Sequence, residues 1–566
     1  MRVRARDGTL SRMTKRIFLL GTFVALALAC ARGHDDGAID PLGGDGGVPA
    51  LDGFDTPSCR EAADKKSSVA CDYYAVHMDG SNGAQNGCFV AFVANTSSQS
   101  TRIEASFGGA PIDLAAHVKL PSGSGTSLTY GDYDPSAGVP PGQVAIVFLA
   151  GPPEPGDTPS IGNANTGFKE PVKCPVKPAL SALTQIIGSG FGRAFRIRTD
   201  HPVVAYQMLP YGGGSAAVTG ATLLIPTSAW GTNLVAVDAY GAGDLQGNGK
   251  TSLDIVAQED GTKVTILPKV DILSSAALQG GKANVPRTYD LDRGQTLQIT
   301  QTLELTGSPI ESNKPISLFA GMPCMNVPRN IGYCDHGEQQ IPHIRAMGSE
   351  YLGAPYRQRT SKIEDVPWRI VGVVDGTKLS YDPPGEGPST LAAGQVAEFT
   401  RNGAFRVKSQ DKDHPFLLVG YMTGADMVDN GGYGDADFVR AVPTAQFLDR
   451  YVFFTDPTYP ETDLVVTRKV GGPPVSLDCY GTIDAWKPLG SAWEVAHVDL
   501  SRHDFQAQGS CDNGVHEMKS AAPFGLTVWG WGTPETKKNT GYVSYGYPAG
   551  ENLATLTDTY VPPQPK

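Results

Sequence analysis

The feature that most constrains this chain is a repeated pattern: an alternating strand, a short polar turn, a proline and an apolar strand. The pattern occurs at residues 195–207 and 405–421, with looser copies at 308–321 and 516–530. A repeat of about 105 residues is too long for a solenoid coil and suits one small β module. The prolines of the four copies recur at intervals of 113, 100 and 108 residues, as Pro202, Pro315, Pro415 and Pro523.

Other markers keep the same order in successive copies, which indicates internal duplication. Asp260-Gly261 matches Asp375-Gly376, and each pair lies between alternating apolar residues. Asp-Gly in such a setting predicts a hairpin, because glycine supplies the positive φ that primed turns need. With 68 glycines, 43 prolines and only 18% charged residues, the composition also favours many short strands over helices.

The fold class predicted from these patterns is all-β. Period-2 alternation within each copy indicates sheets that bury one face. Two packed sheets per copy are the simplest arrangement, so we predict tandem β-sandwich-like modules of about 105 residues. The alternative is a β-propeller of seven or eight blades, because one copy could also form two blades of about 40–50 residues.

The N-terminal residues 1–29 are predicted to be a lipoprotein signal peptide. Lys15 and Arg16 precede an apolar run that is too short for a comfortable membrane span. The run ends Leu-Ala-Leu-Ala before Cys30, which resembles a bacterial lipobox and predicts a lipidated Cys30. Ordinary secretion is the alternative. Residues 30–56 are rich in Asp and Gly and are predicted to form a flexible tether.

The remaining boundaries follow the repeat markers. We predict β modules at residues 57–220, 221–340, 341–440 and 441–548. The last residues, 549–566, contain several prolines and no repeat marker, and they are predicted to be a loose C-terminal tail.

The cysteines indicate disulfides. If Cys30 carries lipid, eight cysteines remain, and an even number in an exported chain predicts pairing. Sequence proximity predicts Cys324 with Cys334, and Cys479 with Cys511. The other four cysteines allow three connectivities, of which proximity favours the pairs Cys59–Cys71 and Cys88–Cys174.

Motifs of catalysis and cofactor binding are scarce, so we predict a protein that is not an enzyme. The sequence has no Gly-x-Ser-x-Gly elbow and no His-Glu-x-x-His helix. The titratable residues at 334–343 and 426–437 are where an unrecognised hydrolase site would lie. The second loop also offers oxygen ligands for calcium, the one cofactor considered. Its acidic residues are Asp426, Asp429, Asp435 and Asp437.

Two tryptophans near the C-terminus, Trp529 and Trp531, are candidates for binding, because tryptophan is enriched at binding surfaces and stacks on sugars. The alternative is that one of them fills the core. Nucleic-acid binding is not expected, since no basic patch interleaves with aromatic residues and the formal net charge is −12.

Several segments together resemble the IgG Fc-binding protein amino-terminal domain, and more closely the bacterial lipoproteins that carry it. They are Leu-Ile-Pro-Thr-Ser-Ala-Trp-Gly-Thr-Asn at 224–233, the Asp-Gly hairpin at 255–266, the proline turn at 307–316 and Gln-Gln-Ile-Pro at 339–342. The likeness covers residues 57–548. It carries over no antibody or mucin binding and no catalytic residue.

These observations lead to one expected function and two alternatives. The chain is expected to be a binding or adhesion lipoprotein that recognises an extracellular protein or glycan of unknown identity. We expect it to be exported and held by its lipid anchor at the bacterial outer membrane or cell surface. The alternatives are a structural envelope component and a secreted hydrolase.

Overall fold

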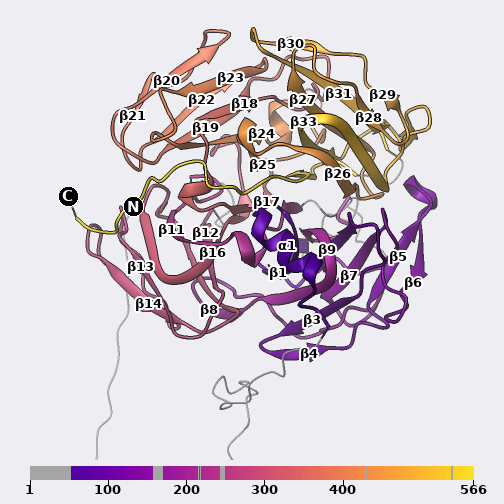
Figure 1. Cartoon of the computed structure of the whole chain (residues 1–566), viewed down its shortest axis with the longest axis horizontal. Helices are drawn as coiled ribbons and strands as arrows, with labels where there is room; N and C mark the ends of the chain where they lie inside the picture. The colour runs from indigo at the N-terminus through magenta and orange to yellow at the C-terminus, as the bar shows by residue number, and fades with distance from the viewer. Residues whose placement is uncertain are drawn as a thin grey trace, which may run out of the picture. The chain divides into compact units, whose positions relative to one another are not determined.

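Nearly every element is a β-strand, which confirms the predicted all-β class. The structure, a computed structural model, describes residues 53–156, 170–214, 216, 218–241, 249–428, 431–536 and 540–565. Among these residues α1 (Pro57–Lys65) is the one α-helix, and it lies beside β1 and β9 (Figure 1). The predicted signal peptide, Cys30 and most of the tether fall outside the described residues.

The strands form four β units, which we number in chain order. The first unit is a nine-stranded sheet. Its strands are β1 (Val69–Ala75), β2 (Phe89–Asn95), β3 (Ile103–Phe107), β4 (Ala110–Ile112), β5 (Val118–Ser122), β6 (Thr129–Asp132), β7 (Val144–Ala150), β9 (Phe195–Leu209) and β10 (Gly220–Leu223). The second unit is an eight-stranded sheet. It contains β8 (Gly190–Arg193), β11 (Gly231–Val235), β12 (Thr251–Ala257), β13 (Thr262–Ile266), β14 (Arg287–Leu291), β15 (Gln295–Gln301), β16 (Pro309–Met325) and β17 (Asp335–Ile341).

The third unit has two four-stranded sheets and the fourth has nine strands. The third unit contains β18 (Glu350–Gly353), β19 (Val366–Gly372), β20 (Thr377–Asp382), β21 (Thr390–Leu391), β22 (Val396–Arg401), β23 (Phe405–Ser409), β24 (Phe416–Met422) and β25 (Asp437–Arg440). The fourth contains β26 (Leu448–Phe454), β27 (Glu461–Lys469), β28 (Val475–Leu477), β29 (Gly481–Thr482), β30 (Lys487–Leu489), β31 (Trp493–Arg502), β32 (Gln506–Ala507), β33 (Val515–Trp531) and β34 (Ser544–Pro548).

The repeated proline motif is where the chain passes from one group of strands in a unit to another. In β9 the residues before Pro202 pair with β3 and most of β1, and those after it pair with β2, β10 and the first two residues of β1. The same change of partners occurs in β16 near Pro315 and in β33 near Pro523. In the third unit Pro415 separates β23 from β24. Proline has no N–H for the ladder, so pairing is interrupted there.

The units exchange strands, unlike the self-contained modules that the repeat predicts. Here β9 belongs to both strand groups of the first unit, and β8 pairs with β15 of the second unit although it precedes β9 in sequence. Neighbouring units therefore interlock, and residues Leu51–Lys566 form one compact unit.

One short strand from each unit lies at the junction of the four units. These central strands β10, β17, β25 and β34 contact one another in a closed cycle. At one end of the cycle, the Thr219 backbone N–H donates to Asp335 Oδ1 and the Ser544 N–H donates to Asp335 Oδ2 at 2.9 Å. The Asp435 N–H donates to Ser544 Oγ at 2.9 Å. One residue from each unit thus joins a buried polar network.

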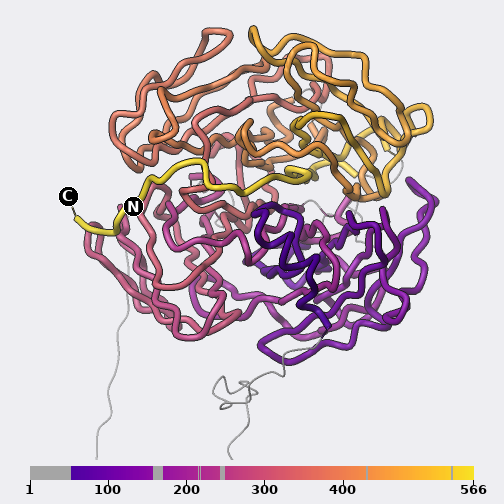
Figure 2. The backbone as a smooth tube through the Cα atoms, viewed as in Figure 1, coloured from indigo at the N-terminus to yellow at the C-terminus, as the bar shows by residue number. Residues whose placement is uncertain are grey.

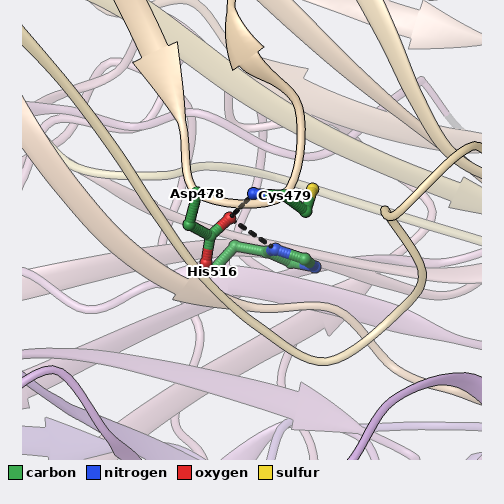
Figure 3. Close-up of side chains that lie close together, drawn as sticks. All are labelled: Asp478, Cys479 and His516. Atoms are coloured by element: carbon green, nitrogen blue, oxygen red, sulfur yellow. Dashed lines mark hydrogen bonds and ion pairs between the residues drawn. The ribbon is translucent and has the colours of Figure 1, made fainter.

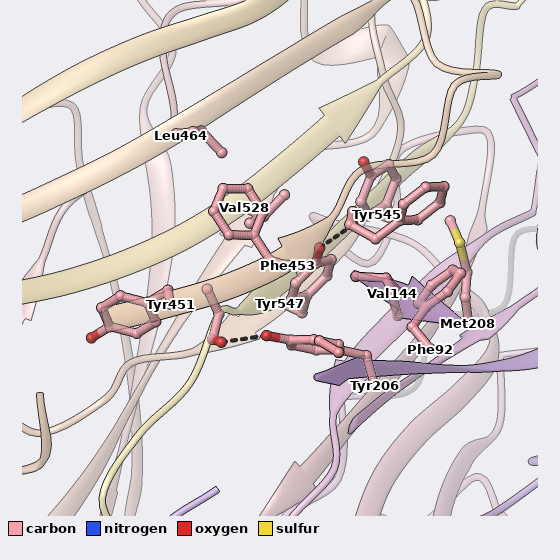
Figure 4. Packing of buried hydrophobic residues seen from close by; sticks show 14 of the residues in the cluster. Phe92, Val144, Tyr206, Met208, Tyr451, Phe453, Leu464, Val528, Tyr545 and Tyr547 are labelled. Atoms are coloured by element: carbon pink, nitrogen blue, oxygen red, sulfur yellow. Dashed lines mark hydrogen bonds between the residues drawn. The ribbon is translucent and has the colours of Figure 1, made fainter. Parts of the chain in front are cut away.

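Apolar packing continues from one unit to the next. The first and fourth units share a core in which the Tyr206 ring lies 4.9 Å from the Tyr547 ring and the Phe92 ring 5.1 Å from the Phe454 ring (Figure 4). The Tyr206 hydroxyl donates to the Val452 carbonyl at 3.1 Å. Contact between the first and last units brings the two ends of the described chain together.

Residues 549–565, which we call the C-terminal strap, are not the loose tail predicted from sequence. In Figure 2 the strap, in yellow, runs between the second unit and the later ones. Its backbone donates hydrogen bonds to carbonyls of three units, from Asn552 to Gln446, Leu553 to Lys66 and Leu556 to Arg345. The sequence did not predict this ordered segment, because its buried residues, such as Glu551 and Leu553, stand among polar residues and prolines.

The disulfides confirm the prediction and identify the connectivity. The four pairs are Cys59–Cys71, Cys88–Cys174, Cys324–Cys334 and Cys479–Cys511. Disulfides are typical of proteins that fold in oxidising compartments. No helix in the described part of the chain is long and apolar enough to cross a membrane.

The length of the chain segment that a disulfide closes predicts how much that disulfide stabilises the fold. The sequence separation is 86 residues for Cys88–Cys174 and 10 for Cys324–Cys334, and all four cysteines are buried. In the chain-entropy account the first contributes about 4–5 kcal/mol and the second about 2–3 kcal/mol. We expect the Cys88→Ala/Cys174→Ala variant to lose about 2 kcal/mol more in urea unfolding than the Cys324→Ala/Cys334→Ala variant. Equal losses would contradict this expectation.

Candidate functional site

A polar groove lies between the third and fourth units. It has a volume of about 450 Å³ and brings together five separate stretches of the chain. The lining side chains used below are Gln358, Tyr433, Glu461, Arg502, His503 and Glu535. A concave site with several converging polar groups is a default candidate for ligand binding.

His503 is held in the groove by backbone and side-chain contacts. Its backbone has a left-handed φ of 55°, an uncommon conformation for a residue with a side chain. The His503 N–H donates to Glu461 Oε1 at 2.6 Å, and His503 Nδ1 lies 3.2 Å from Glu535 Oε2. The Tyr433 hydroxyl donates to Glu535 Oε1 at 2.6 Å. These contacts fix the imidazole while leaving its side chain 51% exposed.

Charge in the groove is arranged around Glu535 and Arg502. The hydrogen bond from Tyr433, followed by that from His503, lowers the pKa of Glu535. The Arg502 guanidinium lies 3.9 Å from Glu461 and 3.7 Å from Asp499, which is beyond hydrogen-bond range in both cases. Its Nε is buried and has no hydrogen-bond partner among the described residues. The side chain as a whole is 33% exposed and is held by these two longer ion pairs alone among the described residues, so the guanidinium can meet a ligand group in the groove.

Two further arginines make the groove wall rigid. Arg357 donates to Glu461 Oε2 at 2.5 Å and to Asp499 Oδ1 at 2.6 Å, and its guanidinium lies 4.9 Å from the Trp531 ring centroid. Arg359 bonds Glu364 Oε2 at 2.9 Å and the Tyr433 carbonyl at 2.6 Å. A preformed wall reduces the entropy cost of ordering side chains on binding.

The predicted tryptophans lie behind the groove, not on its surface. Trp529 and Trp531 are 4% and 0% exposed. Their rings lie 5.1 and 6.1 Å from the Tyr356 ring, within the shared core of the third and fourth units. They cannot stack on a ligand, so the binding interpretation is wrong and the core alternative holds. Both lie on β33, whose second half is buried between neighbours.

The described residues of the acidic loop do not form a cluster of three metal ligands. Asp429 lies outside the described residues. Asp435 and Asp437 are 1% and 0% exposed, and each accepts a backbone N–H, from Ala436 at 2.8 Å and Phe438 at 2.7 Å respectively. Burial raises the pKa of Asp435 to about 7. Neither they nor Asp426 belong to a cluster of three ligand atoms in the described residues.

One cluster of potential metal ligands does occur in the part of the chain that the structure describes. Asp478, Cys479 and His516 bring their ligand atoms within 4.8 Å of one another (Figure 3). Cys479 is bonded to Cys511 and so offers no thiolate. His516 Nδ1 lies 3.0 Å from Asp478 Oδ1, and Nε2 lies 2.7 Å from the Asp512 carbonyl. Because both ring nitrogens of His516 already have partners, we interpret the cluster as a structural hydrogen-bond network.

The other sequence candidate, the disulfide loop at 334–343, points inward. Asp335, His336 and Glu338 are all fully buried. Burial lowers the pKa of His343 to about 4. These side chains support the central strands and do not line the groove.

Sequence reasoning missed most of the groove. His503 has no motif around it, and Arg502, Tyr433 and Glu535 are far apart in the chain. The available signal was weak: Tyr433 lies in the acidic glycine-rich loop that was singled out for calcium.

Comparison with known proteins shows to which family the chain is similar. Residues 220–530, more than half of the chain, match the family described as IgGFc binding protein. The curated IgGFc-binding protein of Homo sapiens is 24% identical over 357 residues, which cover 62% of this chain and 6% of the human protein. The chain thus spans a small part of that relative's length.

Proposed function

The chain belongs to the IgGFc-binding protein family, and from this premise we propose that it is an extracellular recognition protein that binds a protein or glycan through the polar groove. The observation that supports this most is Arg502, which lines the groove and whose guanidinium makes only longer ion pairs among the described residues, at 3.9 Å to Glu461 and 3.7 Å to Asp499. Donors and acceptors of this kind suit hydroxyl, amide and carboxylate groups of a partner.

Export and anchoring form part of the same proposal. The four disulfides and the family support export. The lipobox-like run before Cys30 supports a lipid anchor at the bacterial outer membrane or cell surface, with the Asp- and Gly-rich stretch acting as a tether. Metabolic labelling with a radioactive fatty acid tests the anchor, and label that persists in a Cys30→Ala variant would contradict it.

We propose a binding role without a cofactor and without catalysis. The groove holds a His–Glu pair, but no nucleophile is bonded to His503 Nε2 among the described residues. The acidic residues predicted for calcium are engaged by backbone N–H groups, which supports binding that is independent of the metal.

The experiment is a binding screen of the purified protein against arrays of extracellular glycans and glycoproteins. We expect reproducible binding that is the same with calcium and with a chelator. Loss of binding on chelation would overturn the cofactor-free proposal. A blank array in both conditions would overturn the recognition role and favour a structural envelope component.

A further inference from the structure

A second cavity, largely apolar, lies in the fourth unit. It has a volume of about 420 Å³. We call it the β27 pocket, and the lining side chains used here are Ala445, Phe447, Lys469, Trp493, Pro523 and Phe524. Phe447, Trp493 and Phe524 are nearly fully buried and form its interior, whereas Ala445 and Lys469 are exposed. A pocket of this size and composition can take an apolar side chain.

Lys469 gives the pocket an available positive charge. Its ammonium lies 5.9 Å from the Trp493 ring centroid, and it forms no ion pair with any residue that the structure describes. The neighbouring Arg468 is engaged differently. It donates to Glu494 Oε1 at 2.7 Å and to the Pro473 carbonyl at 2.9 Å, and it stacks on Trp486 at 3.9 Å. Lys469 alone is left for a ligand.

We propose that the β27 pocket binds an apolar side chain from an acidic peptide segment of a protein partner. The apolar interior fits an aromatic or branched aliphatic side chain, and the Lys469 ammonium at the rim complements a flanking carboxylate. A neutral glycan matches this pocket less well than an acidic peptide, because it offers no negative charge to the Lys469 ammonium.

This proposal extends the proposed function to a second site. It rests on the proposed function in one respect, that the partner is an extracellular protein. β27 begins with Glu461 in the groove and ends with Lys469 at the pocket, and it pairs with β31 along its length. Nine strand residues span roughly 26 Å at about 3.3 Å each. An extended segment of similar length would reach from the pocket to the groove.

The test uses a defined probe, the acetylated and amidated peptide Glu-Asp-Phe-Asp-Glu, with a matched peptide in which the four acidic residues are lysine. Binding to the purified protein is followed by calorimetry and by tryptophan fluorescence, because Trp493 lines the pocket. We expect saturable binding of the acidic peptide and at least about tenfold weaker binding of the lysine peptide.

Three variants locate the binding. Lys469→Glu is expected to lower the affinity for the acidic peptide by at least about tenfold. Ala445→Trp, which fills the pocket from an exposed position, is expected to abolish binding of this peptide. Lys378→Glu, an exposed lysine on β20, should leave affinity unchanged. No saturable binding by the unaltered protein, or equal binding by Lys469→Glu, would overturn the proposal. An Arg502→Ala variant that loses array binding but keeps peptide binding separates this site from the groove.

Discussion

Replacing Glu551 by alanine is expected to lower the free energy of unfolding by about 3–5 kcal/mol, because it leaves the Arg440 guanidinium charged and unpaired in the interior. Arg440 Nη1 donates to Glu551 Oε2 at 2.9 Å, and Nη2 donates to Oε1. The side chains are 0% and 1% exposed. The pair joins a central strand of the third unit to the strap, so its loss also frees the strap from the core.

A matched control lies in the same strap. Asp558 bonds Arg345 at 2.9 Å, but the side chains are 78% and 53% exposed. Exposed pairs contribute about 0–1 kcal/mol. Asp558→Ala should therefore change urea unfolding by less than about 1 kcal/mol. Similar losses in the two variants would mean that the strap does not depend on the buried pair.

The buried carboxyl groups are expected to make the protein more stable at pH 5 than at pH 8, and their effect exceeds the opposing effect of His77 and His343, whose burial lowers the pKa of each imidazole. Burial raises the pKa of Asp238 and of Asp435 to about 7, and that of Asp79 to about 6. An Asp with a raised pKa in the folded state contributes stability below its unfolded pKa of about 3.9, and this is lost as pH rises through the folded pKa. Between pH 8 and pH 5, Asp238 and Asp435 should each contribute about 2–3 kcal/mol.

Asp238 is the residue with which to test this dependence. Its Oδ2 accepts the N–H groups of Leu305 at 2.6 Å and Thr306 at 3.0 Å. After burial, the negative charge of Glu304 raises its pKa further, while Arg369 opposes the shift. Asp238→Asn should flatten the rise in melting temperature on acidification, whereas Asp290→Asn, on the surface of β14, should not. Melting temperatures that fall from pH 8 to pH 5 would contradict the account.

Local features of the fold could be predicted from sequence, because strands and turns depend on residues that are near one another in the chain. The period-2 alternation predicted the strands, and the spacing of Pro202, Pro315, Pro415 and Pro523 predicted a repeat of one proline motif. The proline motif marks a real structural event, the change of pairing partners within β9, β16 and β33. Disulfide pairs close in sequence were also accessible.

Long-range features could not be predicted in the same way. Pairing of β8 with β15, and docking of Glu551 on Arg440, depend on residues far apart that no local period connects. Trp531 was a binding candidate because tryptophan is enriched at binding surfaces, yet the third unit covers it. The groove is hidden for the same reason, since Tyr433, Arg502 and Glu535 meet only after the units pack.

The most direct test of the central claim is the affinity of an Arg502→Ala/His503→Ala variant for the strongest partner found on the array. Arg60→Ala, an exposed arginine on α1, serves as the control. We predict that the double variant binds at least about tenfold more weakly at unchanged melting temperature, while the control binds like the unaltered protein. Unchanged affinity in the double variant would show that the polar groove is not the recognition site.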